Sequence, residues 1–145
     1  MINIKIAAFE STVEKSNEWI REVMDEMQWE DPQRAYHGLR AVLHTLRDRL
    51  TVHEATDLAA QLPMLLRGMY YESWTPAKTP VRDRTKEQFL NHIDESFAND
   101  LSVDSEELTR AVFIVLGCHV TQGELDDVKA VLPAPIRELW ADHSA

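Results

Sequence analysis

The chain of 145 residues carries 25 acidic and 15 basic side chains, which give a formal net charge of −10, and it contains one cysteine. A chain of this length can bury one continuous core without disulfides or a structural metal, and a single cysteine excludes both an internal disulfide and a cysteine-rich zinc site. Because basic side chains form no cluster in either half, we predict that the protein binds neither nucleic acids nor anionic membranes.

The amino-terminal residues 1–9 lack the long apolar stretch and the small-residue cleavage site of a secretory signal. The longest apolar run, residues 111–118, is far shorter than the ~20 residues that cross a bilayer. We therefore predict a cytoplasmic protein.

Two helices are predicted at the start of the chain, over residues 9–29 and 32–49. In the first, apolar residues recur at the spacing of one helix face. The second begins at Asp31-Pro32, where an N-cap precedes a proline at the first helical position. Acidic residues repeat every four positions along the first helix, which is typical of a solvated face; the alternative is a surface for a basic partner or a hard cation. These residues are Glu14, Glu18, Glu22, Glu26 and Glu30.

In each half of the chain a short third helix is predicted to begin with a capping box, formed by Thr51 and Glu54 in the first half and by Thr121 and Glu124 in the second. The threonine hydroxyl would accept from the N–H of Glu54, and the glutamate carboxylate would accept from the N–H of Thr51. Leu62-Pro63 ends this helix and begins a fourth, because proline forces its predecessor out of the helical region. Residues 75–82 include two prolines and are predicted to form a stiff connector. An exposed aromatic residue before this connector would mark a docking surface, and the candidates are Tyr70, Tyr71 and Trp74.

The second half of the chain repeats the first at an offset of 70 residues. Residues 40–70 align without a gap on residues 110–140, and eleven of the 31 pairs are identical, where about two would match by chance. The identical pairs include Arg40 and Arg110, Thr51 and Thr121, Glu54 and Glu124, Asp57 and Asp127, Pro63 and Pro133, and Arg67 and Arg137. We therefore predict an all-α protein, a single compact helical domain of two tandem four-helix units related by a pseudo-two-fold duplication, over about residues 9–74 and 83–142.

The first two helices of the second unit are predicted over residues 85–98 and 104–119. The second of these is apolar nearly all round, so we expect it to be the most central helix. Cys118 lies at its end and is expected to be a buried, unreactive thiol.

The two Arg-Ala-Val segments that begin at Arg40 and Arg110, each followed by a T-x-x-E cap and a Leu-Pro with a downstream arginine, resemble a bacterial family known as domain of unknown function 2267. The strongest match covers residues 50–67, and the resemblance extends over essentially the whole chain. The sequence departs from the family pattern at Val131, where a glutamine equivalent to Gln61 would be expected. The resemblance implies a duplicated helical fold and brings no activity, substrate or catalytic residue with it.

No catalytic motif is present: the sequence contains no zinc helix, no E-x-x-H pair, no phosphate-binding glycine loop and no nucleophile elbow. His37 and His44 are seven residues apart and share one helix face with Arg40. Their ordinary interpretation is structural, with His44 at a polar edge of the core, one ring nitrogen bonded, and His37 solvated. We predict no catalytic residue, no metal and no cofactor.

The repeated arginines are the most informative polar residues. Their guanidinium groups are predicted to donate hydrogen bonds to the carboxylates of Asp57 and Asp127 or to the carbonyls at helix ends. The alternative is that they form a pair of quasi-symmetric sites for an anion or a partner. The candidate binding residues are Arg40, His44, Arg67, Arg110, Arg137 and Trp74.

Two functions follow from these observations. The first is a non-catalytic interaction or regulatory module that binds a protein partner or associates with itself, which fits the aromatic residues and the lack of a catalytic set. The alternative is a small-molecule or anion-binding protein, or an enzyme, with a pocket between the two units near Arg40, His44 and Arg110.

Overall fold

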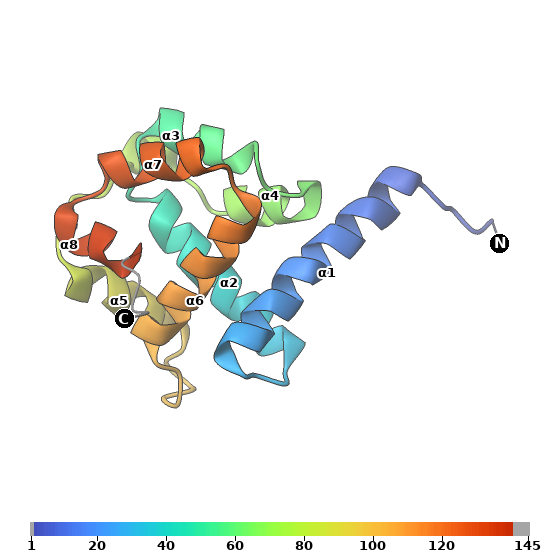
Figure 1. Ribbon diagram of the computed structural model, residues 1–145, viewed down its shortest axis with the longest axis horizontal. Helices are drawn as coiled ribbons and strands as arrows, with labels where there is room; N and C mark the ends of the chain where they lie inside the picture. Colours follow the sequence, from blue (N-terminus) through green and yellow to red (C-terminus); the bar gives the residue numbers. More distant parts are fainter. Residues whose placement is uncertain (1, 141–145) are drawn as a thin grey trace.

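The computed structural model describes residues 2–140, and all the regular structure in that range is helical (Figure 1). The eight α-helices are α1 (Ala7–Met27), α2 (Pro32–Arg47), α3 (Val52–Ala59), α4 (Met64–Tyr71), α5 (Lys86–Ser96), α6 (Ser105–His119), α7 (Gln122–Val131) and α8 (Ala134–Arg137). Two 3₁₀ turns, Pro76–Lys78 and Glu138–Trp140, lie in the connector and after α8. The all-α prediction is confirmed over this range, and residues 141 and 142 of the predicted second unit lie outside it.

The helices α2 and α6 form the centre of the structure. α2 packs against α1, α4, α5 and α6, and α6 packs against α1, α2, α5 and the last 3₁₀ turn. Buried apolar side chains from both halves of the chain form one cluster; the largest fully buried ones include Trp19, Leu39, Leu43, Tyr70, Phe89 and Leu116. The sequence predicted a single most central helix, α6, whereas the structure gives that position to α2 and α6 together. No helix within residues 2–140 has the length and apolarity needed to cross a membrane.

The predicted helix starts are present in the structure. Asp31 accepts from the N–H of Gln33 at 2.9 Å and caps α2, with Pro32 at its first position. Pro63 and Pro133 stand immediately before α4 and α8. A complete capping box, which the sequence analysis missed, forms between Thr85 and the side chain of Gln88 at the start of α5.

Each of the two predicted capping boxes has only one of its two hydrogen bonds. The Thr51 and Thr121 hydroxyls accept from the N–H groups of Glu54 and Glu124 at 3.2 and 3.3 Å. The N–H of Thr121, however, donates to Oε1 of Gln61 at 2.9 Å, and Nε2 of Gln61 donates back to the Thr121 hydroxyl at 3.2 Å. Gln61 therefore takes the place that the sequence assigned to Glu124, and both glutamate side chains are left for another role.

Two predictions of exposure were wrong, and the predicted solvated face of α1 is present at four of its five glutamates. Cys118 is exposed, because the side of α6 that it shares with Ile114, which is 50% exposed, faces solvent. Tyr70 is fully buried and donates to the carbonyl of Ala55 at 2.8 Å, so it offers no docking surface. In the acidic stripe of α1, Glu22 is half-buried and contacts Nε2 of His119 at 2.5 Å, while the other four glutamates are exposed.

We predict that Gln61→Ala lowers the free energy of unfolding by about 1 kcal/mol, because it removes two hydrogen bonds between α3 and α7. Urea denaturation measures this loss. The matched control is Gln122→Ala, which removes only a bond to Asp126 within α7 and costs ~0.3 kcal/mol. Equal losses in the two variants would contradict the assigned role of Gln61.

Candidate functional site

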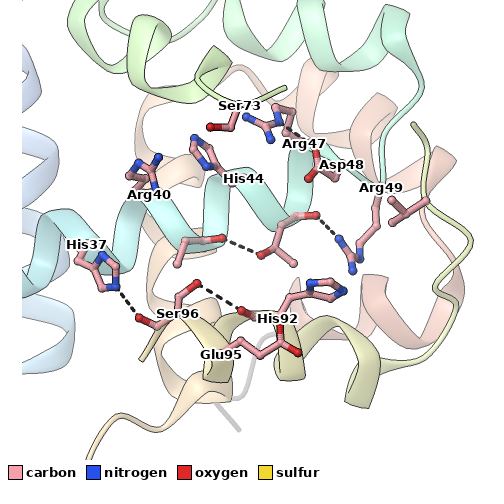
Figure 2. Close-up of a pocket in the computed structure, with 13 residues that line it drawn as sticks. His37, Arg40, His44, Arg47, Asp48, Arg49, Ser73, His92, Glu95 and Ser96 are labelled. Carbon is pink, nitrogen blue, oxygen red and sulfur yellow. Dashed lines mark hydrogen bonds and ion pairs between the residues drawn. The ribbon is translucent and has the colours of Figure 1, made fainter. Parts of the chain in front are cut away.

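A cleft of about 410 Å³ opens between α2, α5 and the residues that connect α4 to α5 (Figure 2). Ligand sites in proteins have volumes of roughly 300–1,000 Å³. The polar residues that line this cleft are His37, Arg40, His44, Thr45, Arg47, Asp48, Arg49, Ser73, His92, Glu95 and Ser96.

The geometry of α2 places these side chains together. His37, Arg40 and His44 follow one another at spacings of three and four residues, so they lie along one side of the helix. Figure 2 shows Arg40, His44 and Arg47 on the side of α2 that faces Ser73, and His92 and Glu95 on the opposite side, on α5. The far end of the cleft is closed by the connector, where the N–H of Val81 donates to the carbonyl of Asp48 at 2.8 Å.

Arg47 is a buried structural cation. Its side chain is 2% exposed and donates to the carbonyls of Tyr70 and Glu72 at 2.6 and 2.8 Å, and to the carboxylate of Asp48 at 2.9 Å. These bonds hold the end of α4 against the end of α2. They also position Ser73, whose backbone φ of 63° is rare for a residue other than glycine.

Arg49 is the second buried cation of the cleft. It donates to the carbonyl of Thr45 at 2.8 Å and pairs with the carboxylate of Asp83, which also contacts Nε2 of His92 at 3.2 Å. Burial lowers the pKa of Arg49, and the nearby charge of Asp83 opposes that effect. The charge of Arg49 is therefore paired within the protein, although its buried Nε has no hydrogen-bond partner in residues 2–140.

Arg40 differs from both, because its guanidinium makes no hydrogen bond and no ion pair with any side chain or carbonyl of residues 2–140. Beside it, Nε2 of His44 donates to the carbonyl of Met69 at 2.7 Å, since a carbonyl can only accept. Burial lowers the pKa of His44, the hydrogen bond to Met69 opposes this effect, and the charges of Arg47 and Arg40 add to it. The net shift favours the neutral ring, whose Nδ1 is an acceptor.

The cleft thus offers one unpaired guanidinium, one hydroxyl at Ser73 and one neutral imidazole within a largely satisfied frame. A guanidinium is a planar donor fork that matches carboxylate and phosphate groups. The chain as a whole is strongly acidic, so an unpaired cation in a concave site marks this cleft as a place for an anion.

The structure separates the remaining predicted site residues from this cleft. Arg67 and Arg137 cap helix ends, as one of the predicted alternatives had it: Arg67 donates to the carbonyls of Ala59 and Leu62, and Arg137 donates to those of Lys129 and Leu132. Arg110 pairs with Glu106 at 3.0 Å and donates to the carbonyls of Glu138 and Leu139. Trp74 is half-buried and stacks on Tyr71 with ring centroids 5.4 Å apart.

Sequence reasoning missed Arg47, Arg49, Ser73 and His92 as residues of this site. The available signal was the concentration of three arginines and two histidines within residues 37–49. That signal could not indicate which of these side chains are paired, because their partners lie 23 to 34 positions further along the chain.

We predict that replacing two arginines of α2 changes the free energy of unfolding by very different amounts. Arg47→Met lowers the free energy of unfolding by about 3 kcal/mol or more, because it leaves two buried carbonyls without donors. Arg40→Met changes it by less than about 0.5 kcal/mol, because Arg40 makes no bond that folding requires. Urea denaturation of both variants checks this contrast, and comparable losses would show that Arg40 is a structural residue too.

Comparison with known proteins gives a family and adds no activity. No curated protein matches the chain. One family profile, described as uncharacterized conserved protein, matches residues 16–139 and so covers both central helices and the cleft. The chain belongs to this family, DUF2267.

Proposed function

We propose that the protein is a non-catalytic, cytoplasmic regulatory module that binds a small anion in the cleft between α2 and α5. The observation that carries this proposal is the unpaired guanidinium of Arg40 beside the neutral ring of His44 in a cleft of about 410 Å³. A carboxylate or phosphate accepts from the guanidinium, and a hydroxyl of the same ligand donates to Nδ1 of His44. The cleft holds no paired nucleophile and base that would favour catalysis over binding.

The proposal includes the duplication predicted from the sequence. In this view α2 belongs to the first four-helix unit and α5 to the second, so the cleft lies between the units. The affinity for a ligand in the cleft would then depend on how the two units pack. The equivalent backbone bonds of Arg67 and Arg137, made 70 residues apart, support two units of one design.

Thermal unfolding in the presence of anions tests the cleft. We expect phosphate, pyrophosphate or citrate to raise the melting temperature of the wild type above that in sodium chloride of equal ionic strength. A ligand at 100 times its dissociation constant stabilises by about 2.7 kcal/mol. Arg40→Gln should abolish the increase without changing the melting temperature in chloride.

Arg84→Gln is the matched control, because it removes the same charge from an exposed arginine outside the cleft. It should retain the full response to the anion. A wild type that responds to none of the three anions, or an Arg40→Gln variant that responds as the wild type does, contradicts anion binding here.

A second function, self-association, is favoured by the beginning of α1. This part of the helix projects away from the other helices (Figure 1). Phe9 and Val13, one turn apart, are 57% and 46% exposed and line a shallow groove with Glu10, Glu14 and Arg21. The three residues before the helix that share this apolar character are Ile2, Ile4 and Ile6. Exposed apolar groups of this kind mark interfaces, and a symmetric dimer covers them with their own copies.

We predict that the protein is a dimer whose mass falls to that of a monomer in Val13→Glu, because a carboxylate cannot be buried in an apolar interface without a partner. Size-exclusion chromatography with light scattering measures the mass. The control is Val52→Glu on α3, which is 44% exposed, close to the 46% of Val13. A monomeric wild type at high protein concentration rejects self-association.

A further inference from the structure

The helices α3 and α7 lie side by side (Figure 1), and carboxylates from both gather at their contact. Glu54 and Asp57 come from α3, and Glu124 and Asp127 come from α7. The members of each pair are three positions apart, so they share one side of their helix. One oxygen from each of Glu54, Glu124 and Asp127 lies within 4.8 Å of the others, and Asp57 forms a second such group with Glu54 and His53.

Two of these carboxylates carry buried oxygens that are without a partner. Glu124 is only 8% exposed, and its Oε1 has no hydrogen-bond donor in residues 2–140. Oε2 of Glu54, on the facing helix, is buried and unpaired in the same way. Buried carboxylate oxygens are almost always bonded, because leaving them unpaired in the protein interior is costly.

No lysine or arginine of the described range forms an ion pair with any of the four. The one cationic contact is that of His53 with Asp57 at 3.1 Å, and the His53 side chain is 80% exposed. Burial raises the pKa of Glu124 to about 7, and the charges of Glu54, Asp57 and Asp127 and a hydrogen bond to the Glu54 side chain raise it as well. Glu124 is therefore partly protonated at neutral pH, and no lysine or arginine of the described range neutralises the charge that remains on the group.

The helix caps do not explain these glutamates. In a complete capping box the carboxylate of Glu124 would bind the N–H of Thr121, but Gln61 occupies that N–H. Both glutamates are retained at equivalent positions of the sequence repeat, and both point instead into the contact between the helices.

We propose that Glu54, Glu124 and Asp127 form a binding site for one hard divalent cation, with the carboxylate of Asp57 beside it on α3. Carboxylate oxygens are ligands that suit calcium, magnesium and manganese. The three oxygens lie within 4.8 Å of one another, close enough for one calcium ion to reach all of them at its usual distance of about 2.4 Å. A set of several protein carboxylates fits calcium best, because calcium takes more ligands than magnesium and magnesium keeps more of its waters.

A bound cation would join the third helix of each half of the chain. It would supply the positive charge missing from the group and would bind the two orphan oxygens. Its free energy of binding would add to that of folding, because the unfolded chain does not hold these helices together.

The cation-free protein should show the repulsion directly. The pKa of Glu124 is raised in the folded state, so the folded protein keeps its full stability below the ordinary pKa of 4.5. The free energy of unfolding then falls as the pH rises to about 7 and Glu124 becomes charged. In EDTA, Glu124→Gln should therefore melt at a higher temperature than the wild type at pH 8, and this advantage should shrink at pH 5.

The test of the site is titration calorimetry, with thermal unfolding in parallel, of EDTA-treated protein at pH 8 with calcium, magnesium and manganese chloride. We expect binding and a higher melting temperature in the wild type, with calcium strongest, and loss of both in Glu124→Gln and in Asp127→Asn. Asp127 is exposed, so its replacement leaves folding intact. Glu26→Gln, which removes one charge from the exposed stripe of α1, should bind as the wild type does.

Two results would overturn the site. One is a wild type that binds none of the three cations, whatever its pH dependence; the two glutamates would then share a proton instead of an ion. The other is cation binding that survives in Glu124→Gln or in Asp127→Asn.

Discussion

The burial of Arg47 is the constraint on which the candidate site depends. A guanidinium that is 2% exposed needs a partner for each buried donor, and the chain supplies them by bringing the carbonyls of Tyr70 and Glu72 to the end of α2. These carbonyls lie at the end of α4. The backbone then turns at Ser73, which has a positive φ, and the connector runs along the cleft. Because these bonds pair Arg47, and Arg34 pairs with Asp100, the cation that remains available on the same helix is Arg40.

The helices could be predicted because their signals are local. Asp31-Pro32, Thr51, Thr121 and the two Leu-Pro pairs act within a few residues of themselves, and each is found near the place the sequence indicates. The apolar run at the end of α6 was misleading in one respect. It predicts burial of Cys118, but a helix covered by neighbours on most sides still has one face in water, and periodicity alone does not say which.

The site was predictable only in part, because its residues depend on contacts between distant segments. Arg40 and His44 were identified from the shared face of one helix, and Arg110 was added to them because it repeats Arg40. The structure shows why that addition fails. The positions equivalent to His44, Arg47 and Arg49 are Ile114, Gly117 and His119, so the second half of the chain has the helix without the polar groups that make the cleft.

The cleft and the carboxylate group therefore relate to the sequence repeat in opposite ways. A cleft between unlike helices takes different side chains from each, so it forms where the two copies have diverged. The ion proposed between α3 and α7 would instead require positions that the sequence repeat shares, and the facing residues Glu54 and Glu124 are such a pair. Residues that a repeat retains without a packing role are for this reason the ones to examine at the contact between its copies.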